Sequence, residues 1–179
     1  MRLLRRVEGS VLWLLESNKW VKNNLLEEVK ARGVSADRLV FSQKLPHKKY
    51  LAQFRQADLY LDTFIYNAGA TASNALWAGL PVLTKLGKGY TSRMAGSLLA
   101  STGLPELITS TAAEYEELAL DLATNPQRLA EIKQKLADNR LSTPLFDTEL
   151  FTRHLEDGYL QAYQRYFDEQ EPKAIYVSE

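Results

Sequence analysis

Short apolar runs that alternate with longer segments of helical periodicity constrain this chain more than any other feature. Each run is continuous rather than alternating in polarity, which is typical of a strand buried on both faces of a parallel sheet. The runs expected to form strands cover residues 10–15, 38–42, 58–62 and 81–84, with a very short fifth strand at 107–108. We therefore expect an α/β fold, a doubly wound parallel sheet of about five strands.

Helices are expected between these strands and throughout the last third of the chain. Those between the strands cover residues 19–32, 46–56, 71–78 and 92–101, and a short one holds the first seven residues. A helical C-terminal extension is expected over residues 112–124, 126–141 and 149–167. Gly33 ends the first long helix, and Pro46 suits a first helical turn because its missing N–H needs no partner there. We expect one domain over residues 1–168 and a polar tail over 169–179.

Composition argues against several functional classes. Lys plus Arg and Asp plus Glu both number 22, so the basic excess typical of a nucleic-acid binder is missing. There is no Cys, which excludes disulfides and thiolate chemistry. His47 and His154 lie far apart, so no metal site is expected. No apolar run approaches the ~20 residues of a membrane span, so we expect a cytoplasmic protein without a membrane or nucleic-acid partner.

The stretch from Asp62 to Asn74 carries most of the expected chemistry. A strand ends there at an acidic residue, a loop of small residues follows, and a helix begins near Thr71. Small residues at a helix N-terminus let backbone N–H groups approach an anion, which the helix dipole stabilises by roughly 0.3–1 kcal/mol at an exposed site. Thr71 and Ser73 add hydroxyl donors, and Asn74 can meet a ribose or sugar hydroxyl. The alternative is an ordinary strand-to-helix turn with Thr71 as its N-cap.

Other large or basic side chains are expected to be structural. Trp13 and Trp77 lie in apolar runs and are expected in the core. Arg128, Lys133, Lys135 and Arg140 are expected to form a solvated helix face.

Residues 66–84, YNAGATASNALWAGLPVLT, resemble the sugar-nucleotide loop of the bacterial and SPINDLY-like O-linked N-acetylglucosamine transferases. In that family a catalytic region follows tetratricopeptide repeats. Segments on both sides agree in order and spacing, among them SVLWLL at 10–15, QADLYLDT at 56–63, SRMA at 92–95 and STPLFDT at 142–148. The resemblance reaches about Phe167. It implies the second, Rossmann-like lobe of a two-lobed GT-B glycosyltransferase, without the first strand of that lobe.

Members of that family transfer N-acetylglucosamine from UDP-N-acetylglucosamine to Ser and Thr hydroxyls of proteins, with no metal or other cofactor. The resemblance implies that this chain binds the UDP-sugar, and that its partners are a protein acceptor and the first lobe and repeats of the same polypeptide. The phosphate-binding lysine of the family lies on a strand upstream of Met1. No catalytic residue is therefore expected within this chain, and the chain alone is expected to be inactive.

The resemblance also implies which residues bind the donor. The loop from Asn67 to Thr71 lies against the diphosphate, and Asn74 reaches the ribose. Tyr50 packs on the uracil with His47 near the base, although both also suit an ordinary helix surface. The full donor-binding set is Leu45, His47, Tyr50, Asn67, Gly69, Ala70, Thr71 and Asn74, with Ser73, Lys88 and Arg93 as possible phosphate-side residues.

Two departures from the family pattern leave other functions open. Better-known members carry His-Thr-Thr where this chain has Gly69, Ala70 and Thr71, and Asp where it has Asn74. The loop thus offers fewer donors to phosphate, and Asn74 meets a ribose hydroxyl without charge assistance. One alternative is a non-catalytic protein-interaction module with a degenerate donor site. Another is a GT-B transferase that uses a different nucleotide sugar or acceptor.

Overall fold

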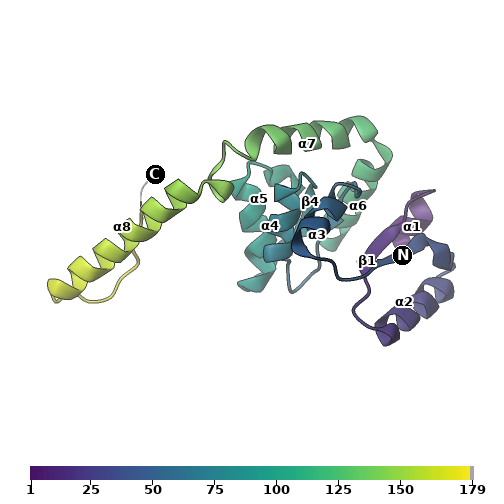
Figure 1. The fold of residues 1–179 in the computed structure, drawn as a ribbon, viewed down its shortest axis with the longest axis horizontal. Coiled ribbons are helices and arrows are strands. Elements are labelled where there is room, and N and C mark those ends of the chain that lie inside the picture. The colour runs from purple at the N-terminus through teal and green to yellow at the C-terminus, as the bar shows by residue number, and fades with distance from the viewer. Residues whose placement is uncertain (178–179) are drawn as a thin grey trace.

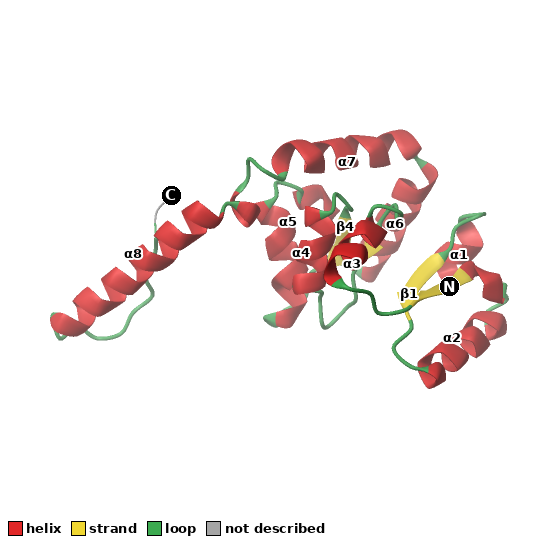
Figure 2. Cartoon of the chain, viewed as in Figure 1, coloured by secondary structure: helices red, strands yellow, loops and turns green. Residues whose placement is uncertain are grey.

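The computed structural model describes residues 1–177 and has the α/β class expected from the sequence (Figure 1; Figure 2). The strands of this part are β1 (Leu12–Leu15), β2 (Leu39–Ser42), β3 (Tyr60–Leu61), β4 (Val82–Lys85) and β5 (Ile108–Thr109). The helices are α1 (Arg2–Arg6), α2 (Lys19–Ala31), α3 (His47–Phe54), α4 (Ala70–Trp77), α5 (Met94–Ser101), α6 (Ala112–Thr124), α7 (Pro126–Asn139) and α8 (Thr148–Phe167). Short 3₁₀ turns lie at Ala36–Arg38, Thr91–Arg93, Pro105–Leu107 and Pro144–Phe146.

Every expected helix and strand is found, with its ends displaced by no more than two residues. The four longest helices begin at a side chain that accepts a hydrogen bond from an N–H of the first turn. These N-caps are Asn18, Thr111, Asn125 and Asp147. Such a cap is worth about 1 kcal/mol, which explains why the sequence located these starts well.

All strand pairs are parallel, as expected, but the strands are divided between two sheets. One sheet has the order β1-β2 and the other the order β3-β4-β5. A doubly wound sheet has the order 3-2-1-4-5-6. Removal of strand 1 from that order leaves 3-2 and 4-5-6, which are the two sheets found here. The division therefore falls where the sequence resemblance places the missing strand.

Helix α1 joins the two sheets. Leu4 is buried in one cluster with Val29 of α2 and Leu39 of β2. Its neighbour Leu3 packs against the second cluster, which Leu83, Tyr115 and Ala119 form on β4 and α6.

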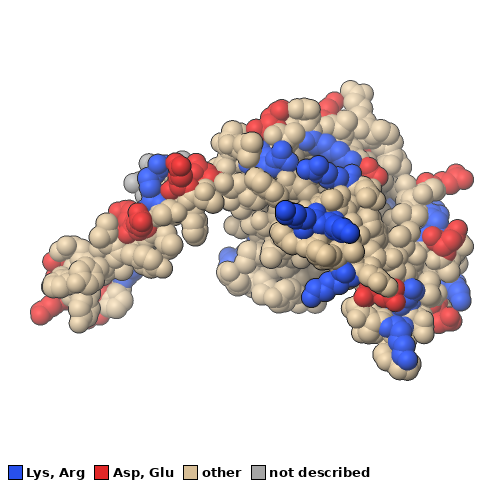
Figure 3. Space-filling model, in the orientation of Figure 1, with Lys and Arg blue, Asp and Glu red and all other residues tan. Residues whose placement is uncertain are grey.

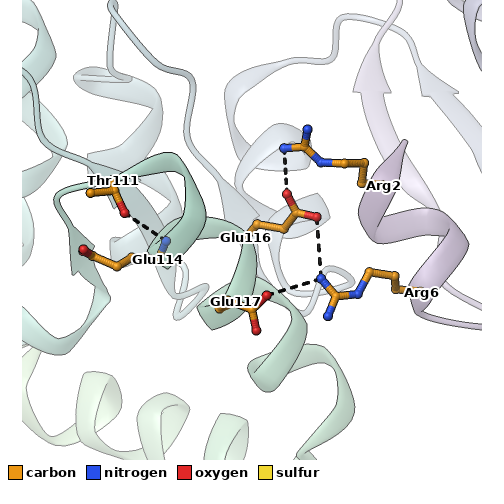
Figure 4. Close-up of polar contacts among 6 residues, drawn as sticks. All are labelled: Arg2, Arg6, Thr111, Glu114, Glu116 and Glu117. Carbon is orange, nitrogen blue, oxygen red and sulfur yellow. Dashed lines mark hydrogen bonds and ion pairs between the residues drawn. The ribbon is translucent and has the colours of Figure 1, made fainter.

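Ion pairs reinforce this junction (Figure 4). Arg2 contacts Glu116 at 2.6 Å, and Arg6 contacts Glu116 at 3.6 Å and Glu117 at 3.5 Å. Exposed ion pairs contribute only 0–1 kcal/mol each, so the leucines rather than the charges hold α1 in place.

The main core lies between β4 and the helices α4, α5, α6 and α7. Its fully buried members include Leu76, Leu99, Leu122 and Leu136. The expectation that Trp77 belongs to this core is wrong, because the side chain of Trp77 is 45% exposed. Successive residues of a helix point about 100° apart, so burial of Leu76 turns Trp77 outward. Trp13 is half-buried.

Helix α8 projects away from the rest of the molecule (Figure 1). None of its residues is buried, and it carries exposed Phe151, Tyr159, Tyr163 and Phe167. The segment after it turns back along the helix (Figure 1), where an Arg165 Nη donates to the Glu171 carbonyl at 2.6 Å.

Across residues 1–177, no helix is both long enough and apolar enough to cross a membrane.

Candidate functional site

The loop between β3 and α4 is held by one buried carboxylate. Asp62, only 4% exposed, accepts hydrogen bonds through Oδ1 from the N–H groups of Thr63 at 2.9 Å and Ala68 at 2.8 Å. Its Oδ2 accepts the hydroxyl of Thr84 at 2.6 Å. The hydroxyl of Tyr115 donates to the Asp62 carbonyl at 2.9 Å. Both ends of the loop are therefore bonded to Asp62, which β4 and α6 hold in place through Thr84 and Tyr115.

Asn67 ties the same loop to the turn that follows β4. Its N–H donates to the Thr91 carbonyl at 3.0 Å, and its Nδ2 donates to the Thr63 carbonyl at 2.8 Å. Thr91 in return donates its hydroxyl to the Ile65 carbonyl at 3.4 Å. The Asn67 side chain is 1% exposed, and its Oδ1 accepts no hydrogen bond from the described residues. The structure thus brings the β3–α4 loop against the turn that carries Lys88 and Arg93, and leaves one buried acceptor unused between them.

The N-terminus of α4 lacks a side-chain cap. The helix begins at Ala70 with Gly69 as N-cap, and no side chain bonds to its first turn. The alternative of an ordinary turn capped by Thr71 is therefore wrong. Thr71 is exposed and lies inside the first turn, with half-buried Ser73 and Asn74 after it. Unbonded N–H groups and the helix dipole make this end suited to an anion.

The turn between β4 and α5 is closed by Ser92. The Gly87 N–H donates to the Ser92 carbonyl at 2.8 Å, and the Ser92 hydroxyl donates to the Gly89 carbonyl at 2.9 Å. Lys88 and Arg93 are exposed on this turn. Because Thr91 of the same turn contacts the β3–α4 loop, both basic residues belong to the segment that lies against the loop.

A row of rings leads from α3 to β3. His47 and Tyr50 have ring centroids 6.3 Å apart, Tyr50 and Phe54 lie edge to face at 4.9 Å, and Phe54 is 6.4 Å from Tyr60. The sequence resemblance implied that His47 and Tyr50 lie near the base of the donor. The structure shows that α3 places the two rings side by side. Leu45, the remaining member of this group, is half-buried just before the helix.

Tyr60 connects this row of rings to Asp62. Burial raises the pKa of the Tyr60 hydroxyl to about 12, with smaller contributions from the Asp62 charge and from Tyr50. Burial likewise raises the pKa of Tyr115, and the Asp62 charge adds to that shift. Both phenols are therefore neutral at physiological pH and act as hydrogen-bond donors or packing groups rather than as bases.

Sequence reasoning missed the residues that fix the loop, namely Thr84, Thr91 and Tyr115. The one indication in the sequence was Asp62, an acidic residue at the end of an expected strand. Within residues 1–177, no three His, Cys, Asp or Glu residues cluster in a way that could hold a metal ion.

Known proteins resemble this chain along almost its full length. The chain is 33% identical over 178 residues to the probable UDP-N-acetylglucosamine–peptide N-acetylglucosaminyltransferase SEC of Arabidopsis thaliana, which covers 99% of this chain and 18% of that protein. It is 32% identical over 166 residues to the UDP-N-acetylglucosamine–peptide N-acetylglucosaminyltransferase of Caenorhabditis elegans, over 93% of this chain and 14% of that protein.

A solved structure agrees with this similarity. A mutant of the Thermobaculum terrenum O-GlcNAc transferase superposes with a TM-score of 0.84 at 31% identity, over 90% of this chain and 32% of that one. This match confirms the GT-B relationship that the sequence implied. The chain spans less than a fifth of the two relatives and about a third of the solved chain. The model of the family described as glycosyl transferase family 41 matches residues 1–155, and with these relatives it shows that the chain belongs to that family.

Proposed function

We propose that this chain is the donor-binding lobe of a protein O-glycosyltransferase that moves N-acetylglucosamine from UDP-N-acetylglucosamine to Ser or Thr hydroxyls. The observation that carries the proposal is the uncapped N-terminus of α4, which follows a loop fixed by Asp62. The names of the Arabidopsis thaliana and Caenorhabditis elegans relatives support the choice of donor and reaction.

The diphosphate binds at the N-terminus of α4 in this proposal. The N–H groups of Ala70 and Thr71 donate to phosphate oxygens, and the Thr71 hydroxyl adds a donor. Gly69 has no side chain, so a phosphate can approach the backbone closely. Lys88 and Arg93 on the adjoining turn supply positive charge. Asn67 Oδ1 is buried beside this site without a donor and is the one unused acceptor of the loop among the described residues.

The nucleoside binds along α3 and the adjoining part of α4. Tyr50 offers a flat ring for stacking on uracil, and Phe54 holds that ring edge to face at 4.9 Å. His47 and Leu45 contact the base from the helix start. Asn74, half-buried beyond the first turn of α4, meets a ribose hydroxyl, and half-buried Ser73 faces the phosphates.

The chemical contribution of this lobe is electrostatic. Negative charge grows on the diphosphate as the bond to the sugar breaks, and fixed N–H dipoles stabilise that charge without reorganising. No metal is needed for this role. Activation of the acceptor hydroxyl and the family's phosphate-binding lysine come from other parts of a longer polypeptide, so this chain alone does not turn over.

Calorimetric titration with UDP, with ADP and GDP as controls, tests the donor site. We expect selective binding of UDP and amide NMR shifts at residues 50 and 69–74. Loss of one base-stacking ring costs about 1–3 kcal/mol, so Tyr50→Ala should weaken UDP binding about 5- to 150-fold. Tyr159→Ala, which removes an exposed ring from α8, serves as the matched control.

Equal affinity for all three nucleotides, or equal losses in the two variants, would contradict this placement. A non-catalytic module is the second candidate, because Gly69 and Ala70 stand where other members carry two more phosphate donors. It would be favoured if the longer polypeptide neither hydrolysed nor transferred any UDP-sugar. A screen of several nucleotide sugars separates it from a transferase that uses a different donor.

A further inference from the structure

A groove of about 450 Å³ lies away from the candidate donor site, between α3, the C-terminal end of α4 and the end of α7. We call it the basic groove. Its basic side chains are Lys48, Arg55 and Arg140, and its apolar lining includes Leu51, Trp77 and Leu141. This volume is within the ~300–1,000 Å³ range of ligand-binding clefts.

The basic groove and the donor site use different faces of the same helices. Lys48, Leu51 and Arg55 follow the spacing of one helical stripe, whereas the rings of His47, Tyr50 and Phe54 form another. The groove reaches α4 at Trp77, seven residues after the helix start, or about 10 Å along the axis. The two sites therefore use different side chains of α3 and opposite ends of α4.

The charges of the basic groove are uncompensated. No Asp or Glu lines it. Among the described residues, Lys48, Arg55 and Arg140 take part in no ion pair, whereas Lys133 pairs with Asp58 at 3.0 Å and Lys135 with Glu106 at 2.7 Å. Figure 3 shows Lys and Arg side chains gathered over α3 and beside α7 on one face of the molecule.

Arg140 is held in the groove with one donor unused. Its Nη donates to the Trp77 carbonyl at 2.9 Å, and the guanidinium lies 5.7 Å from the Trp77 ring centroid. Its Nε is buried and has no hydrogen-bond partner among the described residues. The sequence-based view of Arg140 as one more solvated cation is therefore wrong. The arginine is fixed by α4 with one buried N–H left unpaired.

We propose that the basic groove binds an acidic peptide segment of a partner protein, with an apolar side chain of that segment against Trp77. Lys48 and Arg55 are seven residues apart, which is about 10 Å along the helix. Three or four extended residues span about 10 Å, so an acidic peptide can contact both cations along its length. Trp77 lines the same groove and is 45% exposed, so it offers an apolar contact to a peptide side chain that a bare anion does not use.

Fluorescence anisotropy of a labelled hexapeptide of alternating Glu and Leu, titrated with this chain, tests the proposal. The same peptide with Gln in place of Glu keeps its length and apolar side chains. We expect the Glu peptide to bind and the Gln peptide to bind at least tenfold more weakly. Because charges contribute, the affinity for the Glu peptide should fall as salt rises.

The double variant Lys48→Glu/Arg55→Glu should lower affinity for the Glu peptide by about tenfold or more, since both cations become repulsive. Lys49→Glu/Arg153→Glu changes the net charge equally on exposed residues outside the groove and should bind like the unchanged chain. Circular dichroism verifies that both variants fold.

Two results would overturn the proposal. One is equal binding of the two peptides or equal losses in the two variants, which would show a diffuse charge effect. The other is full displacement of the peptide by inorganic phosphate or by anionic lipid vesicles, which would show a phosphate or membrane site. UDP titration of both double variants separates the two sites, because their net charges are equal and Lys48→Glu/Arg55→Glu should lose no more UDP affinity than Lys49→Glu/Arg153→Glu.

Discussion

Thr84 donates its hydroxyl to Asp62 across 2.6 Å, and both side chains are buried. This bond links the end of β3 to β4 at the point where the chain leaves for the α4 N-terminus. The other carboxylate oxygen of Asp62 holds both ends of the loop through Thr63 and Ala68. The shape of the loop thus depends on a buried anion that is stabilised by N–H and O–H groups, and the N-terminus of α4 depends on that loop.

Thr84→Val should lower the free energy of unfolding by about 1–3 kcal/mol, because it leaves a buried carboxylate oxygen without a donor while keeping the side-chain shape. Urea denaturation measures this change. Thr124→Val removes a hydroxyl that bonds to the Leu120 carbonyl on an exposed helix face and is the matched control. We expect the control to stay within about 0.5 kcal/mol of the unchanged chain. A similar fall in the free energy of unfolding of both variants would show that the hydrogen bond to Asp62 stabilises the fold no more than an exposed one.

Alkaline pH should destabilise the fold through Tyr60. Burial raises the pKa of its hydroxyl to about 12, above the ordinary value of 10.0 that applies in the unfolded chain. A raised pKa means that the folded state favours the neutral phenol. The contribution of Tyr60 to the free energy of unfolding is therefore fully present below pH 10 and is lost as the pH rises towards 12. Tyr115, whose pKa is also raised by burial, acts in the same direction.

Urea unfolding of Tyr60→Phe between pH 8 and about 11.5 checks this linkage. We expect a shallower loss of stability with pH than in the unchanged chain. Tyr159→Phe alters an exposed ring on α8 and should leave the slope as it is. Identical slopes in all three proteins would rule out a contribution from Tyr60.

The sequence predicted the elements of this fold closely because their signals are local. Asn18, Thr111 and Asn125 cap the helices that follow them, and each of these starts was located to the residue. The division into two sheets was not evident from the apolar runs. A continuous run shows that a strand is buried, but it does not show which neighbour it pairs with, and β1 and β3 each pair on one side only.

The candidate site was predicted through the resemblance more than through the chemistry of its residues. Asp62 could be recognised as an acid at a strand end, but its partners lie 22 residues away at Thr84 and 53 residues away at Tyr115. Such contacts follow from the packing of the sheet against α6. Arg140 was misread for the same reason, since its partner Trp77 lies 63 residues earlier.

Helix α8 should be dispensable for the fold of the remaining chain. It has no buried residue and projects from the body (Figure 1). Deletion of residues 148–179 should therefore leave the midpoint of thermal unfolding nearly unchanged, and removal of the exposed rings should reduce self-association. Calorimetry and sedimentation velocity measure the two effects.

Deletion from residue 126 also removes α7, with buried Ile132 and Leu136, and should abolish cooperative unfolding. A large loss from the shorter deletion would contradict the view of α8 as a separate arm.

Gly87→Ala tests the turn that lies against the phosphate-side loop. A Cβ at Gly87 would overlap the Oγ and Cβ atoms of Ser92, which closes the turn through its backbone carbonyl. Gly89→Ala is the matched control, because the nearest atom to its Cβ would be Ser92 Oγ at 3.7 Å, an ordinary contact. Overpacking of this kind costs about 1–3 kcal/mol, so we expect Gly87→Ala to lower the unfolding midpoint clearly and Gly89→Ala to change it little.

Amide NMR shifts should spread from the turn to Asn67, which bonds to the Thr91 carbonyl. Shifts confined to residues 86–93 would show that the turn and the β3–α4 loop move independently, and the coupling inferred from the Asn67 contact would then be wrong.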